Sequence, residues 1–230
     1  MRRMLFAVMV LVPSLAAAQA GVLELTPTIG FVRGGEIFVN DQAFQNREVN
    51  VDMANGGSYG VRFGVGLSQR LQLEFLADHE NGHLKDNKGL FGETPSGFVP
   101  IMSTSVLDFD VTYVHIGLLW HFTPGPNGWY AVVSAGGTRL EPGSPLPSAD
   151  RFSASVGAGV KVELNEHSSL RFEGRYFRTD TSGLPSAVQQ FDPTTYPGKD
   201  CYQGGPCTYT YRYGDTFEQL QLSVGYVIRF

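Results

Sequence analysis

Apolar and polar residues alternate one by one over most of this chain, so its hydrophobic pattern has a period of two. In FSASVGAGVKVEL, residues 152–164, every even position is apolar and every odd position is serine, glycine, lysine or glutamate. The C-terminal stretch LQLSVGYVIRF, residues 220–230, repeats the pattern. A period of two is typical of β-strands with one apolar and one polar face, and helical spacing is almost absent.

The alternation predicts eight strands that are joined in turn by short and long connections. The predicted strands cover residues 22–32, 58–67, 71–80, 106–122, 129–139, 152–164, 169–179 and 213–230. Short turns fall at 68–70, 123–128 and 165–168, and long connections fall at 33–57, 81–105, 140–151 and 180–212. This topology predicts an all-β fold, an eight-stranded antiparallel up-and-down transmembrane β-barrel, with short turns and both termini in the periplasm and long extracellular loops.

The fourth predicted strand is irregular because its apolar residues change phase. They occupy odd positions from 107 to 113 and even positions from 114 to 122. Two explanations fit this change. A β-bulge near Tyr113 and Val114 would shift the phase, or the early residues of the strand project beyond the membrane.

Alternation alone does not say whether the apolar face points into the barrel or out of it. A soluble barrel buries that face around a ligand, whereas a membrane barrel exposes it to lipid. Aromatic residues near strand ends favour the membrane class, because such residues gather at membrane interfaces; they are Trp120, Phe122, Trp129, Tyr226 and Phe230. The alternation of short turns and long loops favours the same class.

The charged residues fix which face is outward. An Arg or Lys that faces lipid at the midplane costs about 2–4 kcal/mol, so turning Lys161, Arg171 and Arg175 outward together would cost on the order of 6–12 kcal/mol. We therefore expect them in the lumen, in an ionic network that fills the barrel and leaves no open channel. The residues of this predicted network are Glu24, Arg62, Glu74, Lys161, Glu163, Arg171, Glu173 and Arg175.

The N-terminus has the features of a cleaved signal peptide. Two arginines precede an apolar stretch from Met4 to Leu15, and Ala18-Gln19-Ala20 matches a cleavage site. We therefore expect a signal peptide over residues 1–20 and an exported barrel domain over residues 21–230. The formal charge of −5 becomes more negative when the leader is removed, which argues against nucleic acid as a partner. No later segment is apolar for long enough to form a transmembrane helix.

Two cysteines, Cys201 and Cys207, lie in CYQGGPC within the last long loop. An exported protein meets an oxidising compartment, so we expect them to form a local disulfide, with metal binding as the weaker alternative.

The leader, the eight alternating segments, LRFEGRYFRT at residues 170–179 and the closing LQLSVGYVIRF resemble the small outer-membrane β-barrel proteins, typified by the OmpA membrane domain and its OmpW-like relatives. The resemblance covers the mature chain. It implies contact with outer-membrane lipid and recognition of the last strand by the barrel assembly machinery. The recognised residues would be Leu222, Val224, Tyr226, Ile228 and Phe230. Unlike the OmpA type, the sequence stops at Phe230 without a peptidoglycan-binding domain, so we expect no anchoring to the cell wall.

Three groups of residues suggest catalysis or metal binding. His79-Glu80-Asn81-Gly82-His83 fits the H-E-x-x-H pattern of zinc proteases, but both histidines reach one ion only on a helix, and this stretch follows a strand and contains the turn dipeptide Asn81-Gly82. We interpret it as a junction between a strand and a loop. Adventitious metal binding by the loop is the alternative.

The other two groups are also better explained by structure than by catalysis. EHSS, residues 166–169, fits a polar hairpin turn better than a catalytic triad. Asp108 and Asp110 would lie near His79 and His83 simply because strands three and four are neighbours, although the set resembles the Asp and His groups of an outer-membrane protease. We therefore expect no enzyme activity and no cofactor or metal.

These observations predict an integral outer-membrane protein with a structural or surface-interaction role and an extracellular partner for its long loops. One alternative is an OmpW-like transporter of small solutes. A second, less favoured alternative is an enzyme at the barrel rim that acts on lipid A or peptides.

Overall fold

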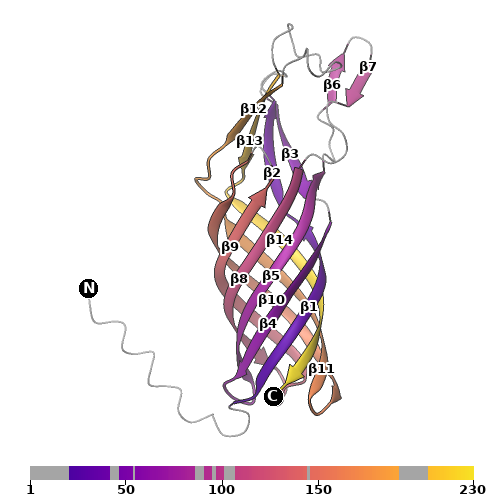
Figure 1. Cartoon of the computed structure of the whole chain (residues 1–230), viewed down its shortest axis with the longest axis vertical. Helices are drawn as coiled ribbons and strands as arrows, with labels where there is room; N and C mark the ends of the chain where they lie inside the picture. The colour runs from indigo at the N-terminus through magenta and orange to yellow at the C-terminus, as the bar shows by residue number, and fades with distance from the viewer. Residues whose placement is uncertain are drawn as a thin grey trace, which may run out of the picture.

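A computed structural model describes residues 21–41, 47–53, 55–85, 91–94, 97–100, 107–143, 146–191 and 207–230 (Figure 1). The predicted signal peptide, residues 1–20, and Cys201 lie outside the described residues, so cleavage and the disulfide stay predictions. Within these ranges, no helix is long and apolar enough to cross a membrane.

Eight long strands form a closed barrel, which confirms the predicted fold class. They are β1 (Leu23–Gly34), β4 (Gly56–Gly66), β5 (Leu71–Lys85), β8 (Leu107–His121), β9 (Gly128–Pro142), β10 (Ala149–Asn165), β11 (Ser168–Asp180) and β14 (Thr216–Arg229). Each is antiparallel to its neighbours in the order β1-β4-β5-β8-β9-β10-β11-β14, and pairing of β14 with β1 closes the ring. Figure 1 shows the strands inclined around one axis.

The two ends of the barrel differ as the connection lengths predict. The turn end carries the short connections 67–70, 122–127 and 166–167 together with the C-terminus (Figure 1). Gly125 in the second of these turns and Gly128, the first residue of β9, have φ of 116° and 97°, a conformation that other residues rarely adopt. The opposite end, the loop end, carries the long connections.

The long connections contain strands that sequence alternation did not predict. They are β2 (Glu36–Asp41), β3 (Arg47–Met53), β6 (Phe91–Thr94), β7 (Gly97–Pro100), β12 (Ala187–Phe191) and β13 (Cys207–Tyr213). Strands β12, β13, β2 and β3 pair in this order and join the barrel through two register pairs, Asp52 with Lys85 and Met53 with Leu84. Figure 1 shows this extension standing beyond the loop end of the barrel.

The apolar face of each barrel strand points outward. On β10, Phe152, Val156 and Val162 are exposed on the outside, whereas Ser153 and Lys161 are buried inside. The outward apolar residues form a band around the barrel. Beyond this band, towards the loop end, the outer face carries polar side chains. They include Arg33, Asp110, Arg139, Asp150, Arg178 and Glu218. An apolar band flanked by polar rims is what a bilayer requires of a barrel surface.

Strand β8 contains no bulge near Tyr113 and Val114. Its register with β5 runs without a shift from Leu107 to Trp120, and its register with β9 is equally regular. Odd-numbered residues face the lumen throughout. The phase change arises because Phe109, Val111 and Tyr113 are buried inside the barrel beyond the outward band. The second explanation, a strand that extends past the membrane, is therefore the one that fits.

Candidate functional site in the barrel lumen

Charged side chains of both signs line the lumen, most of them in its middle and at its turn end. Five cations and five carboxylates on the inward phase are buried: Arg62, Lys161, Arg171, Arg175 and Arg229, with Glu24, Glu74, Asp78, Glu80 and Glu173. The formal charges of these ten groups balance. Buried charges are tolerated in proteins when they are paired and hydrogen-bonded.

The centre of the lumen is a cluster in which two carboxylates each bridge two arginines. Arg171 Nη1 lies 2.5 Å from Glu74 Oε2, and Arg175 Nη2 lies 2.7 Å from Glu74 Oε1. Glu173 contacts the same two guanidinium groups, with 2.9 Å between Arg175 Nε and Glu173 Oε1, and Arg62 Nη2 approaches that oxygen to 3.3 Å. In the ring order β5 is four strands from β11, so the Glu74 contacts join opposite walls of the barrel.

Polar neighbours complete this cluster towards the loop end. Arg62 Nη2 lies 3.4 Å from Asp78 Oδ2 and donates to Gln221 Oε1 at 3.3 Å. The Gln221 amide donates in turn to Ser58 Oγ at 3.0 Å. Every one of these side chains is almost completely buried. The hydrogen-bonding capacity of the central ions is therefore used in several directions, as a stable buried ion cluster requires.

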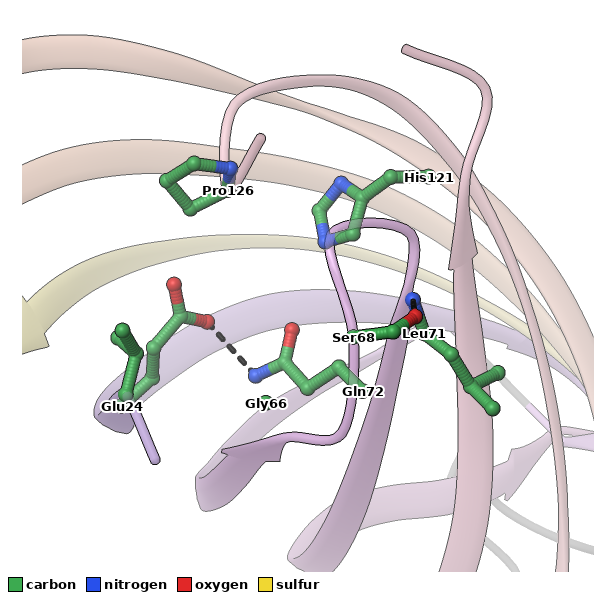
Figure 2. A pocket seen from close by; sticks show the side chains of 8 residues that line it. Glu24, Gly66, Ser68, Leu71, Gln72, His121 and Pro126 are labelled. Atoms are coloured by element: carbon green, nitrogen blue, oxygen red, sulfur yellow. Dashed lines mark hydrogen bonds between the residues drawn. The ribbon is translucent and has the colours of Figure 1, made fainter. Parts of the chain in front are cut away.

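A second cluster closes the turn end. Glu24 accepts from Lys161 Nζ, from Gln72 Nε2 at 2.8 Å and from Arg229 Nε at 3.1 Å. Figure 2 shows the bond between Glu24 and Gln72 at the edge of a cavity of about 20 Å³, with the ring of His121 nearby. That volume suits one water molecule. His121 Nδ1 has no hydrogen-bond partner within the described part of the chain.

The structure brings together seven of the eight residues of the predicted ionic network, and Glu163 lies apart. Its side chain is exposed at the turn end, where its carboxylate accepts from Asn127 Nδ2 at 2.8 Å. Glu163 does belong to the inward phase of β10, but the register with β11 shifts between Glu163 and Asn165 at the mouth of the barrel. Alternation gives the face of a residue and not its depth. Placing Glu163 inside the lumen was therefore incorrect.

Aromatic rings fill the lumen at the loop end. Tyr113 stacks on Phe177 with 4.2 Å between ring centroids, and Phe109 stacks on Phe217 at 5.3 Å. The Tyr113 hydroxyl donates to Gln219 Oε1 at 2.5 Å. Strands β8 and β14 are opposite each other in the ring, so these contacts also cross the lumen. We call these rings the aromatic cap; sequence reasoning missed it because it assigned a polar lumen to the whole barrel length.

Two acidic groups not included in the predicted network lie beside the cap. Asp78 contacts Arg62, as described above. Glu80 is 0% exposed, and no hydrogen bond of normal geometry reaches its carboxylate within the described ranges, although the side chain of Gln219 lies beside it. The sequence could have revealed Glu80, because it is an even-numbered residue of β5 and therefore lies on the same face as Glu74.

The predicted assembly residues occupy the outward phase of β14. Leu222, Val224 and Tyr226 are exposed, Ile228 is partly exposed, and Phe230 is 73% exposed beyond the end of the strand. Their backbones pair with β1 and β11 in the closed barrel.

The H-E-x-x-H stretch lies entirely within β5, so Asn81-Gly82 is not a turn. Asn81 pairs with Gly57 on one side and Asp110 on the other, and pairing on both sides holds the dipeptide extended. His79 points to the outer face, where its Nδ1 lies 2.9 Å from Thr112 Oγ1 and its Nε2 3.2 Å from the Asn81 amide. The interpretation as a junction between strand and loop was incorrect at this point, because the strand continues to Lys85.

Two of the remaining candidates, Asp110 and Ser169, have polar partners that the structure describes. The Asn81 amide, and not a histidine, donates to Asp110 Oδ1 at 3.0 Å. In the 166–169 turn, Ser169 donates to Asn127 Oδ1 at 2.7 Å. Within the described ranges, no three His, Cys, Asp or Glu side chains are grouped to hold a metal ion.

A closed barrel that is apolar outside and ionic inside defines a transmembrane β-barrel. A family model described as the outer membrane protein beta-barrel domain matches residues 4–230. The chain therefore belongs to this family, which locates it in the bacterial outer membrane. No curated protein sequence gives a significant match.

Solved structures with a similar fold include two other outer-membrane proteins. The outer membrane protein OprG from Pseudomonas aeruginosa has a TM-score of 0.53 and 10% identity, over 91% of this chain and 97% of that one. The outer membrane protein AlkL, determined in DMPC lipid bilayers, has a TM-score of 0.53 and 16% identity, over 95% and 94%. At these identities the likeness concerns the fold alone.

Proposed function

We propose that this protein is a non-enzymatic outer-membrane barrel with a closed lumen, which stabilises the envelope or contacts a partner through its loop-end strands. The closed lumen is supported by contacts that join opposite walls of the barrel. They run from Glu74 to Arg171 and Arg175 and from Tyr113 to Gln219. An eight-stranded barrel is just wide enough to be filled by side chains. Ions that enter from either end would have to break these buried pairs.

The extension of β2, β3, β12 and β13 is the part suited to contact a partner. It stands clear of the apolar band, and within the described strands β12 pairs only with β13. An edge strand of this kind offers unpaired backbone groups to an extended segment of another protein. We place this extension outside the cell, with residues 1–20 removed on export.

Proteolysis of intact cells tests this orientation. Protease added to whole cells should cut the long connections and leave a protected barrel, and permeabilising the outer membrane should add no further sites. Cleavage only after permeabilisation would contradict the orientation. N-terminal sequencing of the purified protein should begin near Gly21.

A complementation experiment separates the structural role from the surface role. A strain without the protein receives either the wild-type chain or a chain in which a short Gly-Ser linker replaces residues 36–53. If the role is structural, both chains restore resistance to detergent. If the role is contact with a partner, only the wild-type chain restores attachment or another surface phenotype. Failure of the wild-type chain to restore either phenotype would contradict the proposal.

Transport of a small apolar solute is the second candidate, because the loop end of the lumen is lined by Phe109, Tyr113, Phe177 and Phe217. Planar-bilayer recording and liposome uptake distinguish the two functions. A closed barrel gives no discrete current steps and no uptake of labelled alkane above protein-free liposomes. Uptake that is lost when Phe177 is enlarged to Trp would establish the transporter instead.

The rim enzyme is disfavoured by the surroundings of His79. Its ring nitrogens face Thr112 and Asn81, and neither partner is an acid that could orient a catalytic imidazole. We expect no hydrolysis of lipid A or of peptides by the reconstituted protein. Hydrolysis that disappears in both His79→Ala and Asp108→Ala, with the barrel folded, would overturn the non-enzymatic assignment.

A further inference from the structure

An open groove of about 490 Å³ lies on the outer wall at the loop end, across β9, β10 and β11. Its main lining residues are Gly137, Asp150, Arg151, Phe152, Asp180 and Ser182. None of them belongs to the ionic clusters or the aromatic cap. The volume is in the range of small-molecule sites in proteins.

The lower half of the groove is apolar and has an open floor. Gly137 is paired in register with Phe152 on β10 and with Val114 on β8. A Cβ atom at Gly137 would meet nothing within 4 Å, so the glycine leaves a gap between two side chains that are 65% and 61% exposed. The flank of the Phe152 ring is therefore free to be covered by a ligand.

The upper half of the groove is polar: the carboxylates of Asp150 and Asp180 lie on its outer face, and Arg151, on the inward phase of β10, also lines it. Asp180 Oδ1 accepts from the Ser182 backbone N–H at 3.0 Å. Hydrogen bonds from Ser182 hold the pKa of the Asp180 carboxyl below its usual range. Arg151 Nε is buried and has no hydrogen-bond partner among the residues that the structure describes. Two carboxylate acceptors on the outer face thus lie beside Phe152.

The balance of charge selects the class of ligand. The neighbouring arginines on the outer face, Arg139 and Arg178, contact Glu141 and Glu218. With the two aspartates added, the outer face here has no net positive charge that would select a phosphate or another anion. Carboxylates accept hydrogen bonds from hydroxyl groups. An exposed aromatic ring beside an open floor suits the C–H face of a sugar ring. These features together fit a neutral, hydroxyl-rich ring better than a lipid phosphate or an acyl chain alone.

The depth of the groove indicates where such a ring would come from. Phe152 is the last residue of the outward apolar band on β10, and Asp150, two residues closer to the loop end, belongs to the polar rim. A ligand held there lies at the boundary between hydrocarbon and the headgroup region. We propose that this groove binds a neutral hexose in the headgroup of a membrane glycolipid. The source of the hexose rests on the proposed orientation, with the loop end outside the cell.

The test uses the full mature chain in phosphatidylcholine nanodiscs, free of sugar-based detergents. One arm adds deacylated core oligosaccharide of lipopolysaccharide, and the other incorporates intact lipopolysaccharide in the disc. Saturation-transfer NMR from protein to hexose protons reports contact, and a titration gives the affinity.

Gly137→Leu fills the groove, and Gly57→Leu is its matched control. Gly57 is an exposed glycine on β4 whose added Cβ would also meet nothing within 4 Å, so both variants should fold, as heat-modifiable gel migration checks. We expect Gly137→Leu to weaken hexose binding by about tenfold or more, with Gly57→Leu unchanged. Phe152→Ala should weaken it as well.

Each outcome decides the proposal. If Gly137→Leu loses hexose binding in both arms, the groove recognises the sugar itself. If it loses binding only with intact lipopolysaccharide, the groove recognises the membrane-anchored headgroup. Wild-type protein that binds neither probe, or binds either one equally well in Gly137→Leu, overturns the proposal. So does preferential binding of inorganic phosphate. A conducting lumen or an inverted orientation in cells would overturn the proposed function and leave this nanodisc measurement unaffected.

Discussion

On the turn side of β11 the lumen receives Arg171, Glu173 and Arg175, whereas two residues further the same face of the same strand supplies Phe177 to the aromatic cap. The outer face changes in the opposite sense, from Tyr176 at the edge of the apolar band to the exposed Arg178. On β11 the wall is thus apolar outside and charged inside within the band, and the reverse beyond it. The medium outside the wall determines which face of a strand is apolar.

The two regions should therefore respond differently to substitution. In the ionic region, stability depends on pairing every buried charge with an opposite one, because an unpaired buried ion has lost its hydration without compensation. In the aromatic region, stability depends on packing, as in the core of a soluble protein.

The largest effect is expected for Glu173→Ala in the ionic region. The substitution leaves Arg62, Arg171 and Arg175 short of a shared carboxylate, and breaking a buried pair costs about 3–5 kcal/mol. Urea unfolding in lipid vesicles measures the loss. The control is Glu218→Ala, which removes an exposed carboxylate 3.6 Å from Arg178 and should cost about 0–1 kcal/mol. Equal losses in the two variants would contradict the account.

A comparable or somewhat smaller loss is expected for Phe177→Ala in the aromatic cap. Truncation of a buried Phe typically costs about 3–5 kcal/mol through lost burial and a residual cavity. Phe172→Ala on the same strand is the matched control, because its ring is 42% exposed on the outer face. It should destabilise the barrel less. A larger loss for Phe172→Ala, measured by the same unfolding assay, would show that the cap is not a packed core.

A change of opposite sign is expected for Glu80→Gln. Because the buried carboxylate of Glu80 lies beside that of Asp78 and receives no hydrogen bond of normal geometry within the described residues, neutralising the side chain should stabilise the barrel or leave it unchanged, by up to about 1–3 kcal/mol. Glu173→Gln, with the same change of chemistry in the ionic region, should destabilise it. Destabilisation by Glu80→Gln would show that the contact with Gln219 outweighs the cost of the buried charge.

The smallest effect on stability is expected for Phe230→Ala. The side chain is largely exposed, so the folded barrel should lose less than about 1 kcal/mol. If the assembly machinery recognises the last strand, the yield of folded protein in the outer membrane should nevertheless fall severalfold. Phe122→Ala, an exposed residue at the same end, is the control. Unchanged yield in Phe230→Ala would remove the support for this recognition.

Residue alternation was enough to predict the barrel and which face of each strand points outward. Most of the ionic network could be predicted as well, because burial of Lys161, Arg171 and Arg175 follows from the cost of exposing them to lipid. Alternation could not predict how deep a residue lies, and Glu163 was misplaced for that reason. It also could not show that Asn81-Gly82 stays extended, since pairing with two neighbouring strands overrides the turn preference of the dipeptide.

The aromatic cap escaped prediction for a related reason. The sequence displayed the change of phase on β8 plainly, but a bulge and a change of surroundings give the same pattern. Only the observed register separates them. The strands β2, β3, β12 and β13 were missed because their alternation is short and lies in segments rich in turn-forming residues.

The inversion of polarity at the edge of the apolar band is tested most directly by spin labels on the outer face of β8. Single cysteines at positions 110 and 116, in a chain with Cys201 and Cys207 replaced by serine, carry the labels in phosphatidylcholine bilayers. The account predicts that the label at 116 relaxes mainly with oxygen, as in hydrocarbon, and the label at 110 mainly with a water-soluble nickel chelate. Oxygen-dominated relaxation at both positions, or nickel-dominated relaxation at 116, would contradict it.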